Sequence, residues 1–308
     1  MFVYFCVLDP FVFYRRRSLF IQQLSSNLDV NGLAVCDNRV FVIGISSPTI
    51  EVFDTVSYNQ LQTLTVSAMN DPWDIAAARA TTNSPLYLFD GPYDVLRLSL
   101  DGHITTRWML DGSQQALSVS QRNSVLIAYR DRLDEFNSFG SFLRSVRLDR
   151  RSISHASHSL SLDAEKYVVC HGSGVCSISH AVCLVDVEGR ILKRYQEESG
   201  DGSAYQPLHL ALANNGCVLV ADVHNRRVQI LTQNLGRSYD VISVGRHHGG
   251  PLRVCYDSPR GNVYISTLNG KVLIYRIQTR DSLLTECLDV HSRLIPEHLT
   301  DDCMYTNI

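Results

Sequence analysis

A unit of short β-branched and aromatic runs recurs six times along this chain, and this repeat is the feature that most limits its fold. The clearest copy is PLHLALANNGCVLVADVHNRRVQILT at residues 207–232, where turn sequences separate three such runs. Runs of this kind bounded by Gly, Asn and Asp predict β-strands, and Asn-Gly between two of them predicts a hairpin. The other copies occupy residues 31–54, 72–102, 115–140, 158–189 and 251–277.

Alignment of the first run of each copy places one residue per copy in register, with steps of 42, 41, 43, 51 and 44 residues. Five copies also have a fourth run, at residues 60–66, 104–110, 141–148, 191–196 and 239–244. A period of about 40–45 residues with four strands is typical of a β-propeller blade, and propellers have about four to eight blades. The sequence therefore predicts an all-β fold, a six-bladed β-propeller of four-stranded antiparallel blades.

The last copy has only three clear strands, so the ring needs a closing strand from elsewhere in the chain. We expect SLFIQQL, residues 18–24, to be that strand, with LLTECL, residues 283–288, as its rival. In an alternative arrangement, residues 1–24 supply three strands of a seventh blade. The expected organisation is thus an apolar and basic segment at 1–17, a propeller at 18–278 and a tail at 279–308.

The composition limits the classes of partner and the compartment. Lys and Arg number 28 against 31 Asp and Glu, so nucleic acid would require a local basic face. The apolar run at residues 1–14 is shorter than the roughly 20 residues of a membrane span, and it contains Asp9 and Pro10, so no stable membrane insertion is expected. Nine cysteines without a Cys-x-x-Cys pair indicate free thiols and a cytoplasmic location.

The fifth copy, at NNGCVLVADVHNRRVQIL, resembles an NHL repeat, a Gly-led strand that ends in Val-Ala-Asp and is followed by Asn-x-Arg-Val. The matching positions are Gly216, Val220, Ala221, Asp222, Asn225, Arg227 and Val228. A carboxylate at a strand end can accept hydrogen bonds from turn amides and from the following guanidinium. Asn225 tolerates a left-handed turn. We therefore interpret Asp222, Asn225 and Arg227 as a structural motif.

The wider pattern is similar to the NHL propellers of invertebrate tripartite-motif proteins, in which a RING, a B-box and a coiled coil usually precede the propeller. This chain has neither the Cys/His ladder of a RING nor sustained heptads, so the resemblance does not carry ligase activity to it. It implies a recognition module for protein or RNA, which would be the substrate-selecting part of a ubiquitin-ligase-like protein.

The first strand of each blade should line the central channel, so the residues in register should gather at the mouth of this channel. Those on the first strands are Gly32, Asp74, Gln115, His158, His209 and Arg253, and the loop before the last unit adds Arg246 on the same face. This mixed polar set favours non-enzymatic recognition of a protein partner, with no cofactor and no catalytic residue. Apart from Gly32, these residues are the expected contact site.

Two alternatives remain from the sequence. Arginine clusters at 15–17, 150–151, 226–227 and around Arg246 would suit single-stranded RNA on the same face. His158 and His209 come from neighbouring copies, and two histidines with the aspartate of the ring, Asp74, are residue types that bind metals. Resemblance to six-bladed lyases and lactonases, which hold a metal in the channel, makes His158 and His209 metal candidates. Such a site needs three or four convergent ligands, whereas only two histidines align at this level.

The segment CHGSGVCSISHAVC, residues 170–183, has the density of a metal site but fits two strands of the fourth copy. The residues between them would form an enlarged loop with Cys176 as an exposed thiol. Both tryptophans, Trp73 and Trp108, lie within expected strands, so we expect them in the core.

Overall fold

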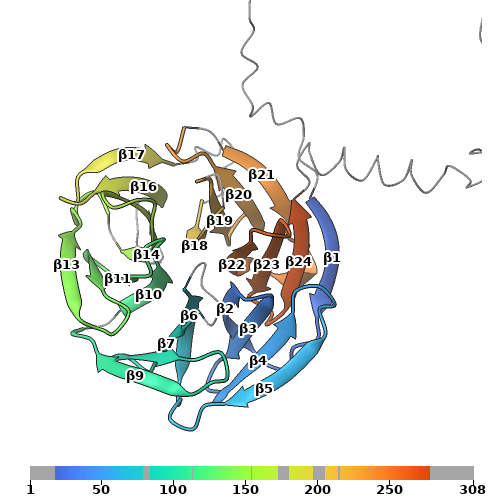
Figure 1. Ribbon diagram of the computed structural model, residues 1–308. Helices are drawn as coiled ribbons and strands as arrows, with labels where there is room; N and C mark the ends of the chain where they lie inside the picture. Colours follow the sequence, from blue (N-terminus) through green and yellow to red (C-terminus); the bar gives the residue numbers. More distant parts are fainter. Residues whose placement is uncertain are drawn as a thin grey trace, which may run out of the picture.

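The computed structural model describes residues 18–277 apart from 79–83, 113, 154, 173–179, 197–204, 214–215 and 237. Within this part of the chain, six four-stranded antiparallel sheets surround a central channel (Figure 1). The fold is an all-β, six-bladed β-propeller, as the repeat predicts. The segments at 1–17 and 279–308, the rival strand at 283–288 and Cys176 lie outside the described residues, so those predictions stay open.

Each blade runs from the channel outwards in chain order, apart from the outer strand of the sixth blade. The inner strands are β2 (Val30–Cys36), β6 (Pro72–Ala77), β10 (Gln114–Val119), β14 (Ala156–Ser161), β18 (Pro207–Leu212) and β22 (Pro251–Asp257). The second strands are β3 (Arg39–Gly44), β7 (Leu86–Asp90), β11 (Val125–Tyr129), β15 (Lys166–His171), β19 (Val218–Asp222) and β23 (Asn262–Thr267).

The third strands are β4 (Thr49–Asp54), β8 (Asp94–Leu98), β12 (Arg132–Phe136), β16 (Ala181–Asp186), β20 (Arg227–Leu231) and β24 (Val272–Ile277). The outer strands are β5 (Gln60–Thr65), β9 (Ile104–Met109), β13 (Phe142–Arg147), β17 (Ile191–Tyr195), β21 (Ser238–Ser243) and β1 (Ser18–Leu24).

The core consists of apolar layers between neighbouring blades. Second strands such as VLIAY of β11 and VLVAD of β19 are buried along their whole length. A strand covered on both faces needs an almost continuous apolar sequence, and this explains the low charge of these runs. Outer strands such as QLQTLT of β5 are largely exposed and mix polar with apolar residues. Among the described residues, six buried clusters fill the six gaps between blades.

The ring closes with β1, the first strand of the described chain, which joins the last blade. β1 pairs antiparallel with β24, from Ser18 opposite Ile277 to Leu24 opposite Val272. Leu24 is buried against residues of the first and sixth blades. Closure leaves no open gap for another blade in the described chain, so the seven-bladed alternative is wrong.

The first strand of each blade has a β-bulge at the same place. In β2, Val30 and Gly32 pair with successive residues of β3, so Asn31 is the extra residue. The other inner strands repeat this pattern. In β10 the register residue is therefore Ala116, and Gln115 is the bulged residue. The sequence alignment placed Gln115 one residue too early because a bulge does not show in the apolar pattern.

The NHL-like motif has the contacts of a turn-stabilising structure. The fully buried Asp222 carboxylate accepts hydrogen bonds from the backbone N–H of Gln206, from Asn225 Nδ2 at 2.7 Å and from Arg227 Nε at 3.1 Å. Asp90 of the second blade likewise accepts the backbone N–H of Asp71 at 2.8 Å. The left-handed residue of the β19–β20 turn is Arg226, with φ of 51°, and not Asn225 as the sequence suggested.

The cysteine-rich stretch separates into two strands, as its alignment predicted. Cys170 lies in β15 and packs between the fourth and fifth blades, whereas Cys183 lies in β16 and packs between the third and fourth. The two free thiols thus lie on opposite faces of one blade, which excludes a disulfide between them. The described chain has one short 3₁₀ helix, Arg246–His248, and no helix long enough to cross a membrane.

Candidate binding site at the channel mouth

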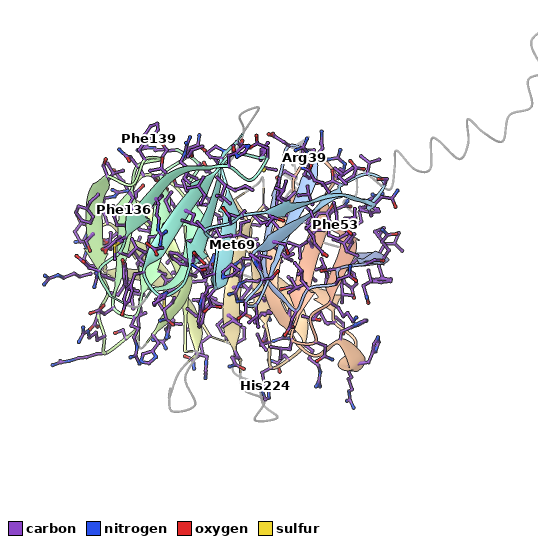
Figure 2. The ribbon with its side chains drawn as sticks, turned by 90° about the horizontal axis from the view of Figure 1, so that it is seen from below. Arg39, Phe53, Met69, Phe136, Phe139 and His224 are labelled. Atoms are coloured by element: carbon purple, nitrogen blue, oxygen red, sulfur yellow. The ribbon has the colours of Figure 1, made fainter. Side chains whose placement is uncertain are left out.

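The two faces of the propeller differ in the loops that they carry. Figure 2 shows Arg39 and Phe139 at one face and His224 at the opposite face. We call the His224 face the mouth face, because the inner strands begin there and their bulges lie close to it. Two rings of residues on the inner strands surround the channel near this face. The outer ring contains the bulged residues, which are Asn31, Trp73, Gln115, Ser157, Leu208 and Leu252.

A pocket of about 340 Å³ occupies the channel mouth. All six bulged residues line it, together with Ile45, Asp71, Ala116, His209 and Arg253. Trp73 is 55% exposed, and its indole N–H donates to Asp71 Oδ2 at 3.1 Å. The expectation that Trp73 packs in the core is therefore wrong, since the bulge turns its side chain towards the channel mouth. Trp108 does pack against the core between the second and third blades.

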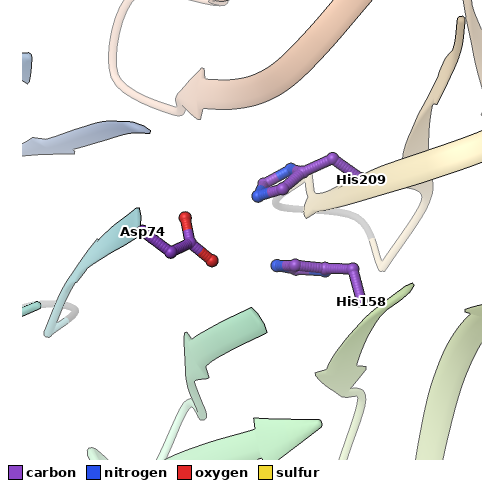
Figure 3. Close-up of side chains that lie close together, drawn as sticks. All are labelled: Asp74, His158 and His209. Atoms are coloured by element: carbon purple, nitrogen blue, oxygen red, sulfur yellow. The ribbon is translucent and has the colours of Figure 1, made fainter. Parts of the chain in front are cut away.

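The inner ring contains the register residues Gly32, Asp74, Ala116, His158, His209 and Arg253. Gly32 adds no side chain, and a Cβ there would lie 2.7 Å from Cγ1 of Ile43. Three of the others form a buried cluster, in which one donor atom each of Asp74, His158 and His209 lies within 4.8 Å of the others. Figure 3 shows the Asp74 carboxylate facing both imidazoles, whose ring centroids are 3.9 Å apart.

Arg253 connects this cluster to the pocket above it. Its Nε lies 3.4 Å from Oδ1 of Asp74, so the sixth blade forms an ion pair with the second. Its Nη2 also donates to the backbone oxygen of Trp73 at 3.4 Å. The carboxylate of Asp74 further accepts the backbone N–H of Leu117 at 3.2 Å, which ties it to the third blade. A buried carboxylate is stable as an ion only with such partners.

The histidines are held in the neutral form. Burial, together with the Arg253 charge, lowers the pKa of His158 to about 3, and burial lowers the pKa of His209 well below its usual value. Burial also raises the pKa of Asp74, with Arg253 opposing that shift. The Val254 N–H donates to Nδ1 of His209 at 3.4 Å. Nδ1 of His158 has no hydrogen-bond partner among the described residues.

The remaining predicted contacts do not join this cluster. Arg246 is exposed on the short helix before β22, and it does not line the pocket. Tyr205, in the segment before β18, is buried, and its ring packs edge-on against Tyr195. Gln115 does line the pocket, although from the outer ring.

A second pocket, of about 430 Å³, contains arginines of the third blade and the loop after it. Arg150 pairs with Asp131, and Arg132 pairs with Asp134 at 2.9 Å while its guanidinium lies 3.9 Å from the centroid of the Tyr129 ring. Arg227, from another of the predicted basic clusters, pairs with Asp222. These carboxylates neutralise Arg132, Arg150 and Arg227, whereas Arg151, Arg226 and Arg246 of the predicted basic clusters are exposed.

By its fold and its site, this protein is a six-bladed propeller with a partly apolar pocket over a buried polar cluster. No family model and no curated protein matches this chain. The resemblance to NHL repeats therefore stays a prediction.

Solved structures agree on the fold. This chain is similar to hydrazine synthase of Kuenenia stuttgartiensis, with a TM-score of 0.58 and 15% sequence identity over 83% of this chain and 97% of that chain. In all, 1483 chains of solved structures match, as expected for an architecture shared by proteins of many functions. At this identity the likeness shows the propeller fold alone.

Proposed function

We propose that this chain is a non-catalytic recognition module that binds a segment of a protein partner in the channel-mouth pocket. The observation that supports it most is the ring of bulged residues, in which the exposed Trp73 lines the same pocket as the apolar Leu208 and Leu252. Tryptophan is one of the residue types enriched among those that contribute most of the binding energy at protein interfaces. The proposal includes two further predictions from the sequence. These are a role as the substrate-selecting part of a ubiquitin-ligase-like protein and a cytoplasmic location.

The charges at the mouth favour protein over RNA. Binding of a nucleic-acid backbone requires cations that are free to contact phosphates. Arg253 is directed at Asp74, and the guanidinium groups of Arg132 and Arg150 already have carboxylate partners. Arg246 is exposed, but it lies outside the pocket. The pocket combines apolar side chains with hydrogen-bonding groups such as Asn31 and Ser157. This combination suits a peptide with an apolar anchor side chain.

Replacing Trp73 with Ala should weaken binding of such a peptide at least about tenfold, because it removes the largest exposed apolar surface of the pocket. Peptides would be selected from a random displayed library against the wild-type protein, and their affinities measured by fluorescence anisotropy. Phe139→Ala is the matched control, since Phe139 is 64% exposed on the opposite face and should leave affinity within about twofold. Equal losses in both variants, or a library without enriched peptides, would contradict the proposal.

A further inference from the structure

The buried cluster below the pocket has the donor types of a transition-metal site. Two imidazoles and one carboxylate come from three different blades, and their donor atoms lie within 4.8 Å of one another. We propose that Asp74, His158 and His209 bind one divalent transition-metal ion, with zinc the best match to this donor set. This site goes beyond the proposed function, since recognition of a partner through the apolar pocket needs no metal.

The burial of the cluster distinguishes it from incidental surface histidines. Asp74, His158 and His209 are all buried, and Nδ1 of His158 lacks a hydrogen-bond partner within the described chain. A buried ring nitrogen without a partner costs free energy, so the histidine is not explained by hydrogen bonding on both sides of its ring. The rings are already neutral, and neutral imidazole is the form that coordinates metals.

Two contacts oppose metal binding. Nε of Arg253 lies 3.4 Å from Oδ1 of Asp74, so it competes for this carboxylate, and its positive charge repels a cation. The Val254 N–H donates to Nδ1 of His209, so coordination through Nε2 moves the ring proton to Nδ1 and breaks this bond. At 3.4 Å this bond is at the long end of hydrogen-bond distances. We therefore expect Arg253 to set the affinity of the site.

Three protein ligands leave the fourth position of a tetrahedral ion for water or for another donor atom. His209 and Arg253 line the pocket directly above the cluster, so this position would be close to a bound partner. The ion could then accept a carboxylate or carbonyl oxygen of a ligand in the pocket.

Titration of the purified chain with zinc sulfate tests the proposal. Isothermal calorimetry should show one equivalent per chain, and His158→Gln or His209→Gln should weaken it at least about a hundredfold, beyond the roughly 10- to 100-fold effect of losing a supporting group. His224→Gln and the double variant His247→Gln/His248→Gln remove histidines of the mouth face that are not part of the cluster, and both should leave affinity unchanged. Binding that is lost only in these controls would overturn the proposal.

X-ray absorption of the zinc-loaded wild-type protein gives a test that does not depend on how variants fold. The expected first shell has nitrogen and oxygen ligands at about 2.0–2.1 Å, two of them imidazole. A shell of sulfur at about 2.3 Å would assign the metal to the cysteines and overturn the proposal.

Arg253→Met gives a test in the opposite direction. Removing the competing guanidinium should tighten zinc binding about tenfold or more, since two like charges within a few ångströms repel strongly where water is excluded. An affinity that is unchanged or weaker in Arg253→Met would show that the ion does not contact Asp74.

Discussion

Acidification from pH 7 to pH 5 should lower the free energy of unfolding by up to about 2 kcal/mol for each of His158 and His209. Burial lowers the pKa of His158 from 6.5 to about 3 in the folded protein, and that of His209 well below 6.5. The unfolded chain takes up protons below about pH 6.5, whereas the folded protein does not do so until the pH is much lower. The stability is therefore complete above pH 6.5 and is lost as the pH falls towards 3.

Urea unfolding followed by circular dichroism at several pH values would measure this loss. In the double variant His158→Gln/His209→Gln the pH dependence between 5 and 7 should become flatter, with a remainder from the buried His171, whose pKa burial lowers to about 4. The exposed-residue control His224→Gln should keep the wild-type slope. The pKa of the neighbouring Asp74 is raised, so its contribution runs in the opposite direction in both proteins. A double variant with an unchanged slope would show that the imidazoles are not buried in the neutral form.

Replacing Leu24 with Ala should destabilise the protein by about 2–5 kcal/mol, the range for truncating a buried leucine. Leu24 is 2% exposed and is part of the core cluster between the sixth and first blades. It also ends β1, the strand that joins the two ends of the ring through its pairing with β24. The loss should therefore combine an unfilled cavity with weaker closure of the propeller.

The control for this variant lies on the same strand. Leu19 is 50% exposed, so Leu19→Ala should change the free energy of unfolding by no more than about 0.5 kcal/mol. Denaturant midpoints of both variants would be compared at constant pH. If Leu24→Ala were as stable as Leu19→Ala, β1 could not be a packed part of the ring in solution.

Local sequence patterns were sufficient for the fold. Runs such as VLVAD and VLIAY predict strands covered on both faces, and their spacing predicts six blades before any contact is known. The closing strand at 18–24 followed from counting strands in the last blade. The structural role of Asp222 could also be predicted from the sequence, because its partners Asn225 and Arg227 lie within five residues along the chain.

The sequence predicted only part of the candidate site. Asp74, His158, His209 and Arg253 stood in register, and two histidines with an aspartate suggested a metal site, yet only the structure shows that Asp74 lies close to both histidines. Trp73 was missed because a bulge of one residue reverses which side of a strand a side chain occupies. The sequence feature that could have identified Trp73 as a pocket residue is its position directly before a register residue. The other bulged residues occupy the same position.

The sequence by itself determined the strands, their number and their order, because burial of a blade between two neighbours imposes a continuous apolar pattern on each middle strand. Only the tertiary structure decided the chemistry of the channel. The donor atoms of Asp74, His158 and His209 come from three blades, and closure of the ring brings them within 4.8 Å of one another. No pattern along the chain encodes a distance across a channel, since that distance depends on how all the blades pack together.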